Sequence, residues 1–389
     1  MLEYLKATAT ERVKERGDQF SGLYAEHGFW SNPFEGSENS MQANYELYTA
    51  RKAELKELTN LLVDSLTGIG TDVAIVGPLG SGARSTANLL AHFLANIDDE
   101  TPTLTLLRER VASIIDTPAT AFTTELRESA KRNIMAALKQ GKLTIMTTNF
   151  FGLTYYTPNM HGESTIETIR KLLEFDSMSS DKVIYLTPWN TTAWKHLAEE
   201  SPTLSGVYET VIELKPLTEK QIVSLLKERM RFYALEGRKT TFTEEILAHI
   251  AKHTGGLPRF ALEAAEKILE QAVEKKIKPQ QAAKHFLSEE KSYEELANTI
   301  KKLIPPPKPW HKKEHTIKRI INAFILLGGA HVTATDIARV IQKSRPAVSR
   351  NLRLLEQHGI VRTETPEHDE RRVPYSLLSF AQAVYENEM

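Results

Sequence analysis

Short apolar runs alternate with helical segments through the first half of the chain, and this alternation restricts the fold more than any other feature. The runs lie at Val73–Val76, Thr103–Leu107, Leu143–Thr147, Val183–Thr187 and Val211–Leu214. Such runs, separated by helices, are typical of a mostly parallel sheet with helices on its faces. The sequence therefore predicts a fold of class α/β, with an αβα core at residues 50–215.

A purely helical pattern follows from residue 218. Helices are expected after the sheet at about 218–233, 243–253, 258–275 and 279–286. One further helix is expected before the sheet, at about 50–65. Apolar residues recur there at helical spacing. The sequence predicts an all-α domain at residues 216–297, and an N-terminal helix with a connecting segment at residues 1–49.

A proline-rich segment separates this helical domain from the last part of the chain. The segment KKLIPPPKPWHKKEH contains three consecutive prolines. Prolines in a row end a helix and stiffen the backbone. We therefore expect a basic linker at residues 298–313 and a C-terminal domain at residues 314–389.

The C-terminal domain has the pattern of a winged helix-turn-helix, an α+β fold. Three helical segments, HTIKRIINAFILLGG, HVTATDIARVIQ and KSRPAVSRNLRLLEQHGIV, precede two strand-like runs around a polar tip. Thr333 is expected to cap the second helix and Ser344 the third, with Pro346 in the first turn. The face of the third helix predicted to point into the core carries Val348, Leu352 and Leu355.

Basic residues lie on the other side of the third helix and on the wing. An α-helix about 10–12 Å across fits the major groove of DNA, where its N-terminal residues meet base edges. Double-stranded DNA is therefore the predicted partner of this domain. The residues predicted to contact it are Lys343, Ser344, Arg345, Ser349, Arg350 and Arg353 in the helix and Arg362, Arg371 and Arg372 in the wing.

The charge distribution also indicates a DNA-facing C-terminal part. Residues 298–389 contain 15 Lys and Arg against 9 Asp and Glu, a net charge of +6, whereas the whole chain carries −1. The first 297 residues therefore carry −7, and such asymmetry is typical of a chain with one nucleic-acid-binding module. The acidic tip of the wing, with Glu367, Asp369 and Glu370, favours the alternative that the winged helix contacts protein.

A known family shares this arrangement. The segment SRPAVSRNLRLLEQHGIV, followed by a wing and by RRVPYSL, resembles the winged-helix domains of multiple-antibiotic-resistance-type regulators over about 75 residues. The resemblance implies binding of double-stranded DNA.

A glycine-rich loop, GPLGSGARST, follows the first strand and precedes a helix. Loops in this position hold phosphates with backbone N–H groups, and the working pattern ends in Gly-Lys-Ser/Thr. Without a gap, Ala83 replaces the lysine; shifted by one residue, Arg84 and Ser85 replace Lys-Ser. Two alternatives stay open: the loop binds ATP or ADP weakly, or its glycines only permit a tight turn. The candidate nucleotide-binding residues in it are Gly77, Gly80, Ser81, Gly82, Arg84 and Ser85.

Other segments resemble the AAA+ ATPases. VIELKPLTEKQIVSLLKERM and HTGGLPRFALEAAEKIL resemble the junction of core and lid and the second sensor, which implies that Arg259 points at nucleotide phosphates. KVIYLTPWN resembles the first-sensor strand, with Thr187 or Asn190 at its polar tip. The order of core, helical lid and winged helix resembles the archaeal replication-initiator (origin-recognition) family.

Three elements of an ATPase are nevertheless absent from the sequence. Thr147 and Thr148 stand where an Asp-Glu pair should hold Mg²⁺ and activate water. The segment SPTLSGVYET lacks the arginine that acts on a neighbouring subunit's nucleotide, and the loop lacks its lysine. Together these absences argue against efficient hydrolysis, so we assign no catalytic residue and no metal site.

The sequence leaves three functional alternatives. In the first, a non-catalytic AAA+ core carries a DNA-binding domain used in DNA organisation, replication initiation or transcription regulation. In the second, the chain is a nucleotide-switched initiator-type ATPase, which requires Arg84 and an acid such as Asp176 or Glu163 to replace the missing groups. In the third, it is a transcription regulator whose α/β domain senses a ligand.

Composition excludes several other classes. The chain has no cysteine, which rules out disulfides and thiolate chemistry. Its longest strongly apolar stretch, near 323–327, is too short to span a bilayer, and no signal peptide is evident. We expect a cytoplasmic, nucleoid-associated protein that forms a homo-oligomer such as a dimer and binds protein partners through the AAA+ core.

Overall fold

The computed structural model describes residues 23–35, 47, 50–65, 72–95, 111–118, 143–149, 183–306, 315–364 and 373–389. The chain forms two compact units. The helical unit consists of Met1–Ala50 with Pro216–Leu296, and the core unit consists of Arg51–Lys215 with Ala297–Met389. Within the described ranges, no helix is both long and apolar enough to cross a membrane.

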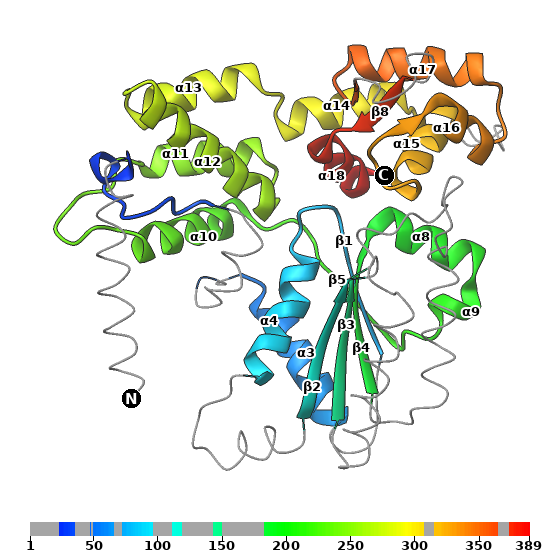
Figure 1. The fold of residues 1–389 in the computed structure, drawn as a ribbon, viewed down its shortest axis with the longest axis horizontal. Coiled ribbons are helices and arrows are strands. Elements are labelled where there is room, and N and C mark those ends of the chain that lie inside the picture. Colours follow the sequence, from blue (N-terminus) through cyan, green and yellow to red (C-terminus); the bar gives the residue numbers. More distant parts are fainter. Residues whose placement is uncertain are drawn as a thin grey trace. The chain divides into compact units, whose positions relative to one another are not determined.

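The core unit contains a five-stranded parallel sheet (Figure 1). Its strands are β1 (Val73–Gly77), β2 (Val111–Pro118), β3 (Leu143–Asn149), β4 (Val183–Asn190) and β5 (Thr210–Glu213), in the order β2-β3-β4-β1-β5. All four pairings are parallel. Every residue of β1 is buried, as expected for an inner strand of a covered parallel sheet. The predicted α/β class is confirmed.

The strands follow the predicted runs in four of the five places. The expected run at Thr103–Leu107 lies outside the described residues. The sequence analysis did not predict β2, whose residues VASIIDTP place Ser, Asp, Thr and Pro among the apolar ones. Its register sets Asp116 beside Thr147 of β3, so that the two strands end at the same edge of the sheet.

Four described helices accompany the sheet in the first part of the core unit. They are α3 (Lys52–Ser65), α4 (Ala83–Ala95), α8 (Thr191–Glu200) and α9 (Pro202–Ser205). Helix α4 follows the glycine-rich loop and packs against β1 to β4. Helix α8 begins where β4 ends, because the side chain of Asn190 accepts a hydrogen bond from the backbone N–H of Ala193 at 2.7 Å.

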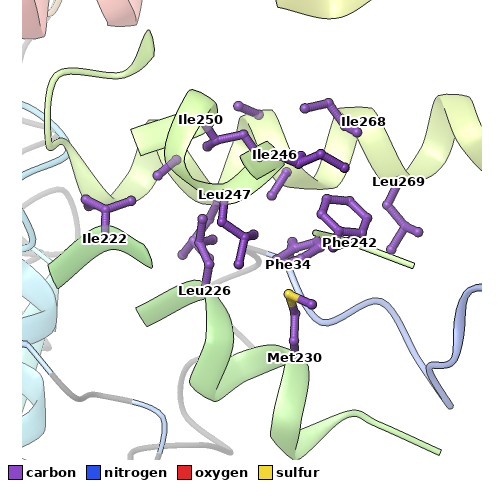
Figure 2. Close-up of a cluster of buried hydrophobic side chains, with 14 of the residues drawn as sticks. Phe34, Ile222, Leu226, Met230, Phe242, Ile246, Leu247, Ile250, Ile268 and Leu269 are labelled. Carbon is purple, nitrogen blue, oxygen red and sulfur yellow. The ribbon is translucent and has the colours of Figure 1, made fainter. Parts of the chain in front are cut away.

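The described residues of the helical unit form a short 3-10 turn, η1 (Ala25–His27), and four helices that lie wholly within the unit. These are α10 (Glu219–Phe232), α11 (Glu244–His253), α12 (Pro258–Glu274) and α13 (Pro279–Glu289), all close to the predicted ranges. Thr218 and Gln221 form a capping box at the start of α10. Figure 2 shows the buried cluster, in which Phe34 from the N-terminal segment lies among side chains of α10, α11 and α12.

The last part of the core unit is a winged helix. It comprises α15 (Thr316–Leu326), β6 (Val332–Thr333), α16 (Ala334–Val340), α17 (Arg345–Gln357), β7 (Val361–Thr363), β8 (Pro374–Leu377) and α18 (Ser379–Glu388). The three strands form an antiparallel sheet in the order β6-β8-β7. The α+β winged helix-turn-helix predicted from the sequence is therefore present, with α18 as an element that the sequence analysis did not assign.

The segment that we expected to be a linker begins with a helix. Helix α14 (Tyr293–Leu303) continues through the first residues of the 298–313 range. Residues 298–303 contain no helix-breaking residue, and proline first appears at Pro305. The non-helical connection therefore starts later than the sequence analysis placed it.

Candidate functional site

Helix α17 has two faces of different character. Val348, Leu352 and Leu355 are each 0% exposed, which confirms the predicted core face. Ser344 occupies the N-cap position and Pro346 lies in the first turn, as predicted. The Ser344 side chain, however, makes no capping hydrogen bond. Its exposed hydroxyl therefore does not cap the helix, and this part of the prediction is wrong.

The opposite side of α17 and the residue before it carry positive charge into solvent. Lys343, Arg345, Arg350 and Arg353 are all exposed, whereas Ser349 is half-buried. Among the ion pairs of the described residues, none involves these four cations. A surface of this kind attracts an anionic partner such as a phosphate backbone.

The next acid along the helix, Glu356, is bonded to the wing. Glu356 accepts a hydrogen bond from the backbone N–H of Thr363 at 3.2 Å and another from the Thr363 hydroxyl. Thr363 belongs to β7, the first strand of the wing. Glu356 therefore ties the end of α17 to the wing.

Helix α16 and its cap position α17 in the domain. Thr333 and Asp336 form a capping box at the start of α16, which confirms the predicted N-cap. Helices α16 and α17 pack against each other. The guanidinium of Arg319 in α15 donates a hydrogen bond to the carbonyl of Ile341, in the turn between α16 and α17, at 2.5 Å. These contacts fix the angle at which the basic face is presented.

Of the three wing residues predicted to bind DNA, Arg362 lies in the described part of the wing. Arg362 in β7 is exposed and forms an ion pair with Glu364 at 3.6 Å. Glu364 also pairs with His331 at 2.6 Å. Arg371 and Arg372 lie outside the described residues, as do the acids of the wing tip.

The glycine-rich loop makes a tight turn between β1 and α4. Gly80 and Gly82 have φ angles of +81° and +97°, a backbone region that side-chain-bearing residues rarely adopt. Ser81, between them, is 1% exposed, and its hydroxyl has no hydrogen-bond partner among the described residues. Arg84 and Ser85 are half-buried in the first turn of α4. The φ angles agree with the alternative in which the glycines permit a tight turn. The buried Ser81 hydroxyl remains as one polar group for a ligand.

A buried arginine lies against this loop, and the sequence analysis did not single it out. Arg51 is 4% exposed and donates a hydrogen bond to the carbonyl of Ser81 at 2.9 Å. It also pairs with Glu54 at 3.1 Å. Its φ of +68° is unusual for a residue with a side chain. No sequence motif marks Arg51, because its contact with the loop joins residues 30 positions apart.

A second contact of the loop comes from the last helix. The backbone N–H of Leu79 donates a hydrogen bond to the Glu386 carboxylate at 2.7 Å. Glu386 is 4% exposed, and its second oxygen accepts from the Gln382 amide at 3.0 Å. Burial raises the pKa of Glu386 to about 7, against the opposing effects of these two hydrogen bonds and of Lys195. Sequence reasoning missed this residue as well.

The remaining residues suggested for nucleotide chemistry have structural partners. Thr187, completely buried in β4, lies 3.2 Å from the Tyr208 hydroxyl, and Asn190 caps α8. Arg259 is half-exposed and pairs with Glu263, one turn along α12, at 2.7 Å. Thr147 lies near the end of β3. The described residues contain no group of three or more His, Asp or Glu that could hold a metal ion.

Comparisons with known proteins identify the architecture. Residues 319–372 match the MarR family. The structure of the Aeropyrum pernix ORC2 protein (ADPNP-ADP complexes) is similar at 14% identity with a TM-score of 0.50, covering 87% of this chain and 94% of that chain. The structure of the Aeropyrum pernix ORC1 protein in complex with DNA is similar at 15% identity with a TM-score of 0.49, covering 87% of this chain and 92% of that chain. Cdc6p from Pyrobaculum aerophilum is similar at 15% identity with a TM-score of 0.45, covering 92% of this chain and 98% of that chain.

No curated protein matches the chain in sequence. The likeness to ORC2 shows that the chain has a fold similar to that of ORC2. The match at residues 319–372 shows that the winged helix at the C-terminal end is similar to the MarR family. The two resemblances stated from the sequence are thereby confirmed for the fold.

Proposed function

We propose that the protein binds double-stranded DNA through α17 and the wing, and that it acts in DNA organisation, replication initiation or transcription regulation. The observation that carries this proposal is the row of four exposed cations at α17 that form no ion pair with the described residues, on a winged helix similar to the MarR family. Helix-turn-helix domains place this helix in the major groove, and cations beside it bind phosphates. Arg345, Arg350 and Arg353 are its expected principal contacts.

The proposed role of the AAA+ core is structural. Thr147 and Thr148 lie near the end of β3, at the positions where an Asp-Glu pair would supply the metal ligand and the general base. We infer that the core holds ATP or ADP weakly at the glycine-rich loop and does not hydrolyse it efficiently. The ORC2 structure was solved with ADPNP and ADP, which supports nucleotide binding by the shared fold.

Self-association and partner binding complete the proposal. We expect the core to mediate a homo-oligomer, a dimer or larger, and to offer a surface to other proteins, while DNA binding keeps the protein on the nucleoid. Light scattering coupled to size-exclusion chromatography tests the oligomer directly, and a monomer at all concentrations would contradict it.

The DNA-binding proposal is tested by the double variant Arg350→Ala plus Arg353→Ala. Anisotropy of a labelled duplex should show binding weakened about tenfold or more. The slope of log affinity against log salt should become shallower by about 0.9 for each lost phosphate contact. Binding as tight as that of the wild type would show that α17 does not face DNA.

A matched control removes two exposed cations elsewhere. Lys220→Ala plus Lys284→Ala changes the net charge equally at exposed positions of the helical unit. The control should bind nearly as tightly as the wild type. If it weakens binding as much as the α17 variant does, the effect comes from net charge. Genome-wide occupancy then distinguishes an origin factor, a promoter regulator and a general DNA-coating protein.

A further inference from the structure

We propose that the glycine-rich loop is an anion site which the chain fills with its own Glu386, so that a phosphate group and helix α18 compete for the loop. This inference does not depend on the proposed DNA binding, but it rests on the proposed weak binding of ATP or ADP at the loop. It assigns a role to α18 and explains why a phosphate-type loop is closed in the structure.

The loop presents donors suited to an anion. The Leu79 N–H points at a carboxylate oxygen at 2.7 Å. Ser81 has a buried hydroxyl that no other described residue bonds, and Arg51 brings a buried guanidinium to the Ser81 carbonyl. The Nε atom of Arg51 is also buried without a partner among the described residues. Backbone N–H groups in such a turn and a nearby fixed positive charge favour a negatively charged group.

The carboxylate that meets these donors is held firmly in place. One oxygen of Glu386 contacts Leu79 and the other accepts from Gln382, one turn earlier in α18. Helix α18 packs against α8, the helix that follows β4. The residues beside Glu386 in α18 are also anchored. The Tyr385 hydroxyl donates a hydrogen bond to the Asn322 side chain at 2.5 Å, and Glu388 forms an ion pair with Lys301 at 2.5 Å.

A phosphate oxygen and the Glu386 oxygen cannot both accept the Leu79 hydrogen at this distance. Nucleotide binding at the Leu79 N–H therefore requires the Glu386 carboxylate to withdraw, which releases the contact between α18 and the loop. Because the displacement costs free energy, the docked helix lowers the apparent affinity for phosphate. The cations of α17 are already exposed while α18 is docked, so this closure does not cover the proposed DNA-binding face.

The test compares ADP binding by the full-length chain with that of Glu386→Ala, by isothermal titration calorimetry. Above pH 7, where Glu386 is ionised, removing the carboxylate should tighten ADP binding about tenfold, the effect expected for one charge-assisted hydrogen bond. Glu236→Ala is the control: it removes the same charge at an exposed position of the helical unit and should bind ADP as the wild type does. Equal affinity of the Glu386→Ala variant and the wild type, or no ADP binding by the variant, would overturn the proposal.

A second measurement needs no variant and detects the displacement itself. Hydrogen exchange of the wild type in saturating ADP should slow in the loop peptide, 77–86, and quicken in the α18 peptide, 379–388. Protection of the loop with unchanged exchange in α18 would overturn the competition. Loss of duplex binding by the α17 variant, in contrast, bears only on the proposed function, since Glu386→Ala should bind DNA as the wild type does.

Discussion

Phe34 and Phe242 pack with their ring centroids 5.0 Å apart, although 207 residues separate them in the chain. Both rings are buried, at 0% and 5% exposure, in the cluster drawn in Figure 2. Phe29 lies within 6.5 Å of each. Arg229 of α10 donates to the carbonyls of Pro33 and Glu35 and so holds the same segment. The N-terminal segment is therefore part of the core of the helical unit.

Replacing Phe34 with alanine should destabilise the helical unit strongly. Removing a fully buried aromatic ring leaves a cavity and costs about 3–5 kcal/mol. Because the chain has two compact units, the change is best followed by hydrogen exchange of peptides from α10, α11 and α12 in the full-length protein. Exchange in these peptides should rise markedly, with little change in the sheet of the core unit.

Leu23→Ala is the matched control for this prediction. Leu23 belongs to the same segment but is 59% exposed, so its truncation should cost within about 0.5 kcal/mol. If Phe34→Ala leaves exchange in α10 to α12 as slow as in this control, the segment does not stabilise the unit.

The sequence was sufficient for the elements whose pattern is local. The helices of the helical unit and the core face of α17 follow from apolar residues at helical spacing, because burial of one face decides those structures. The Thr333 cap was likewise readable from the sequence, since its partner Asp336 is three residues away. The Arg259–Glu263 pair also has a local signal, an i,i+4 spacing, which indicates a partner on the same helix.

Contacts between distant segments were not predictable from such patterns. The Leu79–Glu386 hydrogen bond joins positions 307 apart, and no periodicity of α18 indicates that its carboxylate meets the loop. The packing of Phe34 against Phe242 is of the same kind. Strand β2 was not predicted because polar residues interrupt its apolar run. Its pairing with β3 stabilises the strand. Tertiary structure overrides local preference in all three places.

Loss of the α16 cap should weaken the winged helix modestly. Thr333→Ala removes the acceptor of the Asp336 N–H and one half of the capping box, at a cost of about 1 kcal/mol. Thermal unfolding monitored by circular dichroism should show the loss. Thr335→Ala, at an exposed position in the same helix, should leave the transition nearly unchanged. Equal effects of the two changes would mean that the capping box contributes nothing measurable.

ATP turnover should stay at background, with or without duplex DNA. The described end of β3 offers threonines, and Asp176 and Glu163, the acids suggested as replacements, lie outside the described residues. Loss of the general base and metal ligand removes orders of magnitude in rate. Phosphate release by the wild type and by Arg84→Ala should therefore be indistinguishable. Turnover that Arg84→Ala abolishes would instead establish the nucleotide-switched ATPase.

The contact between α18 and the loop should make stability depend on pH. The pKa of Glu386 is raised from 4.5 to about 7 in the folded chain, chiefly by burial. A raised acid pKa means that the folded state holds the proton more tightly. The stability contributed in this way is fully present below about pH 4.5 and is lost as pH rises through about 7. The groups facing the carboxyl are the Leu79 N–H, Gln382 and, on α8, Lys195.

Glu386→Gln isolates this effect because the amide stays neutral at every pH. Between about pH 5 and about pH 8, the free energy of unfolding of the wild type should fall relative to that of the variant, by at most about 1.4 kcal/mol per pH unit. Urea denaturation of the two proteins in parallel, monitored by circular dichroism, measures the difference and cancels the other titrating groups. A difference that stays constant over this range would show that Glu386 titrates normally, and a difference of opposite sign would show that the buried group prefers its charged form.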